Sequence, residues 1–209
     1  MAKVKNFILV VNSCPENLKF KIFHQEDLKL SVTGIVDRIG KERSLVSILE
    51  HSSGRMVLKN YPAGISDHQQ AMRIIFLHLK SWKRKINLVA NRVVYGGQKF
   101  GEITPLKKSV IDQLKKYNKI SAKDNPINLS LAVLLQEILP NARHFAIFEN
   151  VFFEKIPLAN RNYPIQDIYK DEYLVSRYGA SGISTQYVLG AAQEKIKKSF
   201  KKIKIVGKI

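Results

Sequence analysis

The chain has 209 residues, of which 45% are hydrophobic and 25% are charged, so it can bury a core and is too apolar for a disordered protein. It has no run of about 18 uncharged apolar residues, which excludes a membrane-spanning helix, and its single cysteine, Cys14, excludes an intramolecular disulfide and favours a reducing cytoplasm. The net charge of +18 makes phosphorylated ligands or nucleic acid candidate partners, but the lysines are scattered and we interpret most of them as a solvated surface.

The first part of the chain predicts a meander of β-strands. Residues 7–12 form the continuous apolar run that is typical of a central strand, and the turn-forming sequence SCPEN follows. Residues 18–23 alternate between apolar and basic side chains, which indicates a half-buried strand. Further strands are expected in three segments, at 28–36, 44–51 and 54–59.

The second part predicts helices that alternate with strands. Helical periodicity is expected over residues 67–84, with Ser66 or Asp67 as the N-cap, and over 105–118 and 126–139, which both begin with proline. Strands are expected at 86–97, ending in a Gly-Gly turn, and at 142–149. Residues 150–183 are predicted to be looser, and 184–203 to form a helix. The order of elements predicts a mixed α/β domain with helices packed on a sheet.

Three predicted strands end in polar residues. Asn12 ends the first strand, Arg92 lies near the end of another with Gly96 and Gly97 after it, and Glu149 ends the last. Ligands of such sheets bind beyond the carboxyl ends of the strands. These ends are therefore the candidate site, with Arg92 in an otherwise apolar strand where a charge without a partner is costly.

Five segments, in order along the chain, resemble the acetate/butyrate kinase family. FILVVNSCPENLKFKIF resembles the family's opening strand, phosphate loop and second strand, and ANRVVYGGQKF is similar to its Gly-His-Arg-Val-Val-His-Gly-Gly sequence. The other three are DNPINL, FAIFENVFFEKIP and YPIQDIYKDEYLVSRYGASGISTQYV. Together they extend over essentially the whole chain.

The resemblance implies an α/β fold of the actin/hexokinase-like (ribonuclease H-like) type, a mixed sheet with flanking helices. Residues 1–155 would be the first lobe, and residues 156–209 the start of a second lobe that ends in a basic helix. The implied reaction transfers the γ-phosphoryl group of ATP, with Mg²⁺, to acetate or another short carboxylate.

The same resemblance assigns candidate roles to individual residues. Arg92 would contact both the carboxylate and the transferring phosphoryl group, a task that suits a guanidinium, and Val93 would also bind substrate. Glu149 takes the place of the family's catalytic aspartate and would orient metal or substrate. Asn12 and Lys19 match positions near the phosphates, and Asn12 also lies near the metal.

Several positions depart from the family pattern. The Gly-Ser-Ser-Ser phosphate loop is replaced by Cys14-Pro15-Glu16-Asn17, in which proline removes a backbone donor and glutamate repels phosphate. Ala180-Ser181 stands in place of Phe-His, and Lys123 in place of a leucine of the acetate methyl pocket. Asn125 and Asn128 remain, and turn and helix-start roles explain them adequately. We therefore expect little or no kinase activity from this chain alone.

Two alternatives remain open. The chain could be a non-catalytic module, either a truncated remnant or a lobe that binds a partner, with an exposed apolar surface around residues 150–209 and a homodimer or a missing-lobe partner as candidates. Nucleic-acid binding, through a basic tail with seven lysines between Lys195 and Lys208, is the least favoured.

Overall fold

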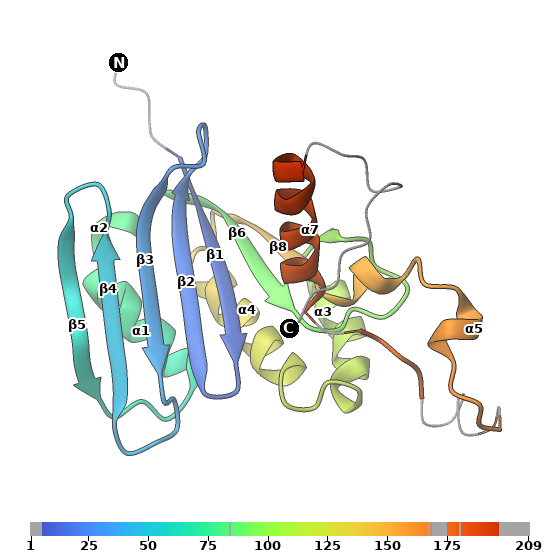
Figure 1. Ribbon diagram of the computed structural model, residues 1–209. Coiled ribbons are helices and arrows are strands. Elements are labelled where there is room, and N and C mark those ends of the chain that lie inside the picture. The colour runs from blue at the N-terminus through green and yellow to red at the C-terminus, as the bar shows by residue number, and fades with distance from the viewer. Residues whose placement is uncertain (1–5, 84, 167, 169–174, 180, 197–209) are drawn as a thin grey trace.

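The computed structural model describes residues 6–83, 85–166, 168, 175–179 and 181–196 (Figure 1). In this part of the chain, eight strands form one sheet in the order β5-β4-β3-β2-β1-β6-β8-β7. The strands are β1 (Phe7–Cys14), β2 (Asn17–His24), β3 (Leu30–Asp37), β4 (Ser44–Glu50), β5 (Arg55–Ala63), β6 (Ile86–Val93), β7 (Ile103–Pro105) and β8 (Arg143–Phe148).

Helices connect the strands of the second part of the sheet. They are α1 (His68–His78), α2 (Lys80–Lys83), α3 (Lys108–Lys115), the 3₁₀ helix η1 (Lys116–Lys119), α4 (Asn125–Ile138), the 3₁₀ helix η2 (Asn150–Phe153), α5 (Leu158–Arg161) and α7 (Gly182–Ile196). β1 to β5 pair antiparallel, whereas β6 runs parallel to β1 and β8 runs parallel to β6. Parallel neighbours need long crossover connections, which the helices supply. The predicted mixed α/β architecture is confirmed.

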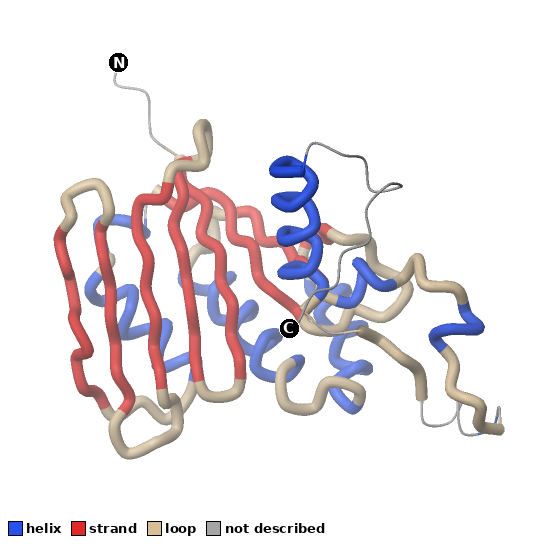
Figure 2. Tube along the Cα trace, in the orientation of Figure 1, coloured by secondary structure: helices blue, strands red, loops and turns tan. Residues whose placement is uncertain are grey.

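The main core lies on one face of the sheet. Every second residue of the central strands is buried there, among them Leu9 of β1 and Phe20 of β2, and they pack in one apolar cluster with Met72 of α1 and Leu134 of α4. Figure 2 shows these helices behind β1 to β5. Within the described residues, the opposite face of these five strands has no helix packed over it.

Several predicted element boundaries were wrong. The helix predicted over 67–84 breaks at Leu79, between α1 and α2, although Asp67 is confirmed as the N-cap because its side chain accepts a hydrogen bond from the Gln70 N–H. The strand predicted to reach residue 97 ends at Val93. A short edge strand, β7, ends in Pro105, where the sequence predicted a helix start. Proline has no N–H to donate to a ladder, and an edge strand tolerates it because one side of that strand is unpaired.

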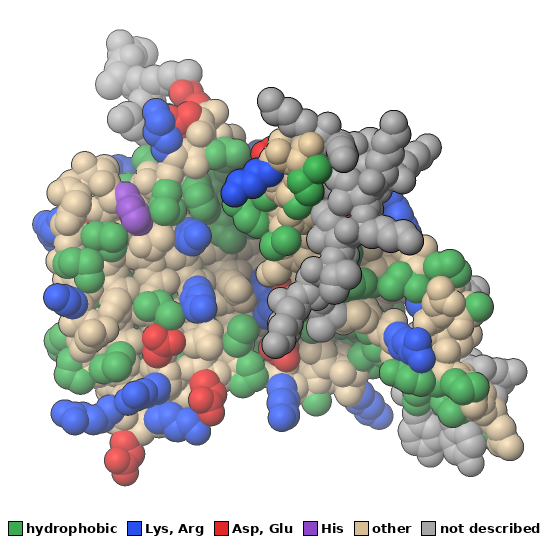
Figure 3. Space-filling view, viewed as in Figure 1, with side chains coloured by type: hydrophobic (Ala, Val, Ile, Leu, Met, Phe, Trp, Pro, Cys, Tyr) green, Lys and Arg blue, Asp and Glu red, His purple; other side chains and the backbone are tan. Residues whose placement is uncertain are grey.

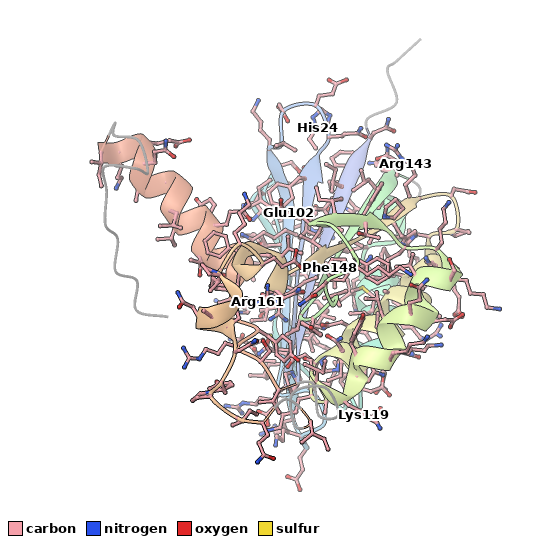
Figure 4. The ribbon with its side chains drawn as sticks, turned by 90° about the vertical axis from the view of Figure 1, so that its right-hand side faces the viewer. His24, Glu102, Lys119, Arg143, Phe148 and Arg161 are labelled. Atoms are coloured by element: carbon pink, nitrogen blue, oxygen red, sulfur yellow. The ribbon has the colours of Figure 1, made fainter. Side chains whose placement is uncertain are left out.

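The last described part of the chain packs less completely than the sheet. Seven of its large apolar side chains are exposed: Ile156, Tyr163, Ile165, Ile168, Tyr187, Val188 and Ile196. The expected exposed apolar surface is thus confirmed for the described residues. A view from the β8 side shows α7 on one side of the sheet and α3 on the other, with Phe148 between them (Figure 4).

Other expectations for this region remain untested. The basic tail beyond Ile196 lies outside the described residues, and the division of the chain after residue 155 stays a prediction. No helix in the described part is both long and apolar enough to cross a membrane.

Candidate active site

The three polar strand ends lie together at one edge of the sheet. β6 lies between β1 and β8, and the register that pairs Val11 with Asn91 brings Asn12 beside Arg92. Arg92 pairs with Ile147 of β8, two residues before Glu149. The sequence therefore located this edge correctly.

Arg92 and Glu149 bond to each other. The Arg92 Nε donates to Glu149 Oε1 at 2.6 Å, and the side chains are 17% and 10% exposed. Arg92 Nη1 also donates to the carbonyl oxygen of Ser13 at 3.0 Å. Charge-assisted hydrogen bonds of this length are among the strongest in proteins. A charge in this otherwise apolar strand is costly without a partner, and Glu149 is that partner.

Three buried asparagine side chains hold the backbone where β6 leaves the sheet. Asn125 accepts from the Tyr95 N–H at 3.1 Å and donates to the Tyr95 carbonyl at 2.8 Å. Asn150 accepts from the Gly96 N–H at 2.9 Å and donates to the Gly97 carbonyl at 3.1 Å. These amides replace the ladder bonds that the backbone loses when the strand ends.

Asn128 joins β1 to the same turn. Its amide nitrogen donates to the Ser13 hydroxyl at 2.8 Å and to the Ser13 carbonyl at 3.1 Å, and its oxygen accepts from the Val94 N–H at 3.3 Å. Ser13 thus bonds to both Asn128 and Arg92. We call this group the strand-end cluster and define it as Arg92, Glu149, Asn125, Asn128 and Asn150.

From the sequence, Asn125 and Asn128 were predicted to have only turn and helix-start roles, and Asn150 was not a candidate. Their spacing of three residues at a helix start was the available signal, because it places both side chains on one face of the helix. Asn150 gave no such signal, since its role depends on the fold of the turn at Gly96.

The segment in the place of the phosphate loop is a tight hairpin. β1 and β2 pair up to Cys14 and Asn17, so that only Pro15 and Glu16 form the turn. The Glu16 carboxylate pairs with Lys41 at 3.0 Å. Little loop backbone is left to surround a phosphate group with N–H donors.

Asn12 and Lys19 are direct cross-strand partners on β1 and β2. Both side chains are exposed on the uncovered face of the sheet, and Lys19 makes no ion pair with any residue in the described ranges. The structure therefore brings Asn12 near Arg92 but places Lys19 one strand further away.

Val93 does not join these residues. Its side chain is fully buried in a second apolar cluster with Leu114 and Phe148. Lys123, in the place of the methyl-pocket leucine, is exposed, and Ala180 lies outside the described residues.

The C-terminal segment covers the end of the cluster. The ring of Tyr178 packs edge-on against that of Tyr95, with centroids 4.6 Å apart, and burial raises the pKa of both phenols. A side chain at Gly182 would overlap the carbonyl group of Glu149, so α7 can begin here only because this residue is glycine.

The same geometry bears on the implied magnesium ion. Mg²⁺ is bound through carboxylate oxygens, waters and substrate phosphates. Glu149 is the carboxylate at this edge, and its Oε1 already accepts from Arg92. Among the described residues, no three His, Cys, Asp or Glu side chains gather in a way that could hold a metal ion. The one carboxylate of the cluster is thus already engaged by Arg92 through one of its two oxygens.

Comparisons with known proteins agree on one family. The sequence model described as the acetokinase family matches residues 7–208. The chain is 30% identical over 206 residues to the acetate kinase of Halothermothrix orenii, and 28% identical to that of Thermotoga maritima. These alignments cover 95% of this chain but only 51% and 50% of the relatives, so the chain spans about half of their length.

Solved structures show the same fold. The acetate kinase of Porphyromonas gingivalis matches with a TM-score of 0.79 and 24% identity, and a propionate kinase of Francisella tularensis with 0.81 and 22%. Each match covers 93% of this chain and 50% of the other. The expected actin/hexokinase-like α/β fold is confirmed.

Proposed function

Because the chain belongs to the acetokinase family, we propose that it is one half of an acetokinase-type phosphotransferase and that this half alone transfers phosphoryl groups from ATP to acetate, or to another short carboxylate, weakly or not at all. In this proposal, residues 1–155 form the first lobe and 156–209 begin the second. The observation that carries it is the ion pair between Arg92 and Glu149.

Phosphoryl transfer depends on positioned cations that neutralise developing charge. Two donor groups of Arg92 are already bonded, Nε to Glu149 and Nη1 to the Ser13 carbonyl. An incoming carboxylate or phosphoryl group would have to compete with Glu149, whose negative charge would also repel it. The remaining Nη donors of Arg92 could contact a substrate only beside the Glu149 carboxylate.

The phosphate side of the site is equally restricted. The hairpin at Pro15 and Glu16 leaves little backbone to bind phosphate, and Glu16 adds a negative charge there. Asn12 and Lys19 are the remaining candidates for phosphate contacts, and both lie on the solvent-exposed face. Productive binding of ATP and Mg²⁺ would therefore depend on groups from a second half, such as the relatives carry. We also propose that the protein acts in the cytoplasm, as expected from its single cysteine, Cys14.

A non-catalytic, partner-binding role is the second candidate. It is favoured by α7, on which Tyr187 is 77% and Val188 53% exposed. Apolar side chains grouped in this way often mark interaction surfaces. The described residues offer no comparable support for nucleic-acid binding, because the lysine-rich tail lies outside them.

A turnover assay tests the main proposal. The purified 209-residue chain is incubated with ATP, Mg²⁺ and acetate, and acetyl phosphate is measured. We expect little or no product above the level of a heat-inactivated control, and we count only turnover well above that level as activity.

Turnover that is lost in Arg92→Ala, but kept in Arg143→Ala, would overturn the proposal. Arg143 is an exposed arginine at the start of β8 and serves as the matched control. Circular dichroism establishes that both variants are folded before activity is compared.

A further inference from the structure

The uncovered face of β1 to β5 carries both apolar and cationic side chains. We call it the open face and define it by Val10, Lys19, Lys21, Ile35, Leu49 and Met56. In the cross-strand register, Val10 lies opposite Lys21, Lys19 lies opposite Ile35, and Leu49 lies opposite Met56. These residues therefore form one continuous surface across the five strands.

The open face is hollowed and partly apolar. It lines a depression of about 450 Å³, and Val10 and Met56 are 36% and 44% exposed. Figure 3 shows hydrophobic and basic side chains side by side over these strands, with acidic side chains near their lower ends. The solvated face of an antiparallel sheet normally alternates to polar residues, so the apolar members indicate a surface that is covered in a complex.

The lysines of the open face lack acidic partners. Within the described residues, the acids Asp27, Glu16 and Glu149 pair with Lys29, Lys41 and Arg92, whereas Lys19 and Lys21 take part in no ion pair. Their charges point to an occupant with carboxylates.

Charge also distinguishes between the candidate occupants. A second copy of the chain would bring a further +18 toward a face that already carries two unpaired lysines. Its exposed helix α7 ends at Ile196, carries Lys195 in its last turn and offers a single acid, Glu194. Self-association through this face is therefore disfavoured relative to an acidic partner.

We infer that the open face binds an amphipathic helix of a separate polypeptide, with an apolar stripe flanked along one edge by Asp or Glu. Lys19 and Lys21 are two residues apart on β2, which places them about 6.6 Å apart along the strand. Acids at positions i and i+4 of a helix are spaced by about one turn, roughly 6 Å. Such a helix, aligned with β2, would pair both lysines and place its stripe over Ile35 and Leu49.

Two designed helical peptides test this inference. Each has about 18 residues, because a helix of that length extends along the full length of the strands. Both carry the same leucine stripe, flanked by Glu in one peptide and by Lys in the other. Each fluorescently labelled peptide is titrated with the 209-residue chain, and anisotropy is measured at two salt concentrations. The variants are Leu49→Glu and the pair Lys19→Glu with Lys21→Glu.

The matched control exchanges Lys107 and Lys108 for Glu at the start of α3, where both are exposed. We expect saturable binding of the Glu peptide that falls by roughly tenfold or more in both open-face variants and is kept in the control. The charge-reversed variant should instead bind the Lys peptide.

Three results would overturn the inference. The first is that neither peptide binds. The second is an equal loss of binding in the Lys107 and Lys108 control, which would indicate attraction to the net charge alone. The third is a dimer in sedimentation that Leu49→Glu dissociates without any peptide, which would assign the open face to a second copy of the chain.

Discussion

The strand-end cluster and the open face belong to the same sheet but differ in whether their polar groups have partners within the described chain. In the strand-end cluster, the Arg92 charge and the three asparagine amides find partners within the chain. On the open face, Lys19 and Lys21 have no such partners among the described residues and lie beside exposed apolar groups. The first region is satisfied internally, whereas the second presents its charges and apolar groups to solvent.

Occupying the right position in the fold does not by itself make a residue part of a working site. Arg92 stands at the strand end where ligands of such sheets bind, yet its bonds are directed to Glu149 and Ser13. The location of a residue therefore does not establish its availability. The partners of the side chain decide whether it can bind a ligand or instead stabilises the fold.

The largest expected effect comes from breaking the ion pair on one side. Glu149→Ala leaves the Arg92 guanidinium partly buried without a counter-charge, and we expect a loss of roughly 3–5 kcal/mol in the free energy of unfolding. The double variant Arg92→Met with Glu149→Leu should recover most of that loss, because it leaves no unpaired charge. Urea unfolding of the wild type and both variants measures this.

If Glu149→Ala costs less than about 1 kcal/mol, as exposed ion pairs do, the cluster is not a structural element and the contrast with the open face fails.

The two faces of the sheet can be compared directly at two neighbouring residues of β4, which point to opposite faces. Ile48 is fully buried in the main core, whereas Leu49 points to the open face. Ile48→Ala should cost about 2–5 kcal/mol through lost burial and a cavity. Leu49→Ala should cost no more than about 1 kcal/mol, because nothing described covers it.

Chemical denaturation of both variants gives the two values. Equal losses would mean that the open face is already covered in the isolated chain, and the docking inference would lose its basis.

Much of the fold was accessible from the sequence because burial on a sheet has a simple signature. The alternation in residues 18–23 located β2, and the apolar run at 7–12 located β1. The break at Leu79 and the edge strand β7 gave no such signal. They depend on how the chain leaves the core, and the periodicity of apolar residues carries no information about that.

The candidate site was predicted only in part. The sequence located Asn12, Arg92 and Glu149 at one edge, because parallel strands place their carboxyl ends together. It did not show that Arg92 and Glu149 bond to each other, or that Val93 is buried. These facts depend on side-chain directions in the folded chain.

The smallest expected effect concerns His144, a partly buried histidine of β8. Burial lowers the pKa of His144 below 6.5, and its Nδ1 is buried without a partner while Nε2 bonds to the Leu139 carbonyl at 3.1 Å. Between 6.5 and the lowered value, the unfolded chain binds a proton that the folded chain does not. Stability should therefore fall as the pH falls through this window.

Thermal unfolding between about pH 7.5 and 5 tests this assignment for His144. His144→Gln keeps a donor for Leu139 and should show a shallower decline than the wild type. Identical slopes would show that other groups cause the pH dependence.

The most direct test of the account measures whether the isolated chain binds the ligands of a phosphotransferase. A ligand that binds only the folded state raises the unfolding temperature, and the rise continues with the logarithm of the ligand concentration above Kd. Thermal unfolding of the 209-residue chain is followed with increasing MgATP, acetyl phosphate and acetate, beside the double variant Arg92→Met with Glu149→Leu. We predict no rise in the unfolding temperature of the wild type with any of them beyond that of a matched salt control, because Glu149 neutralises Arg92. A rise in the wild type that grows with ligand concentration and disappears in the double variant would contradict this prediction.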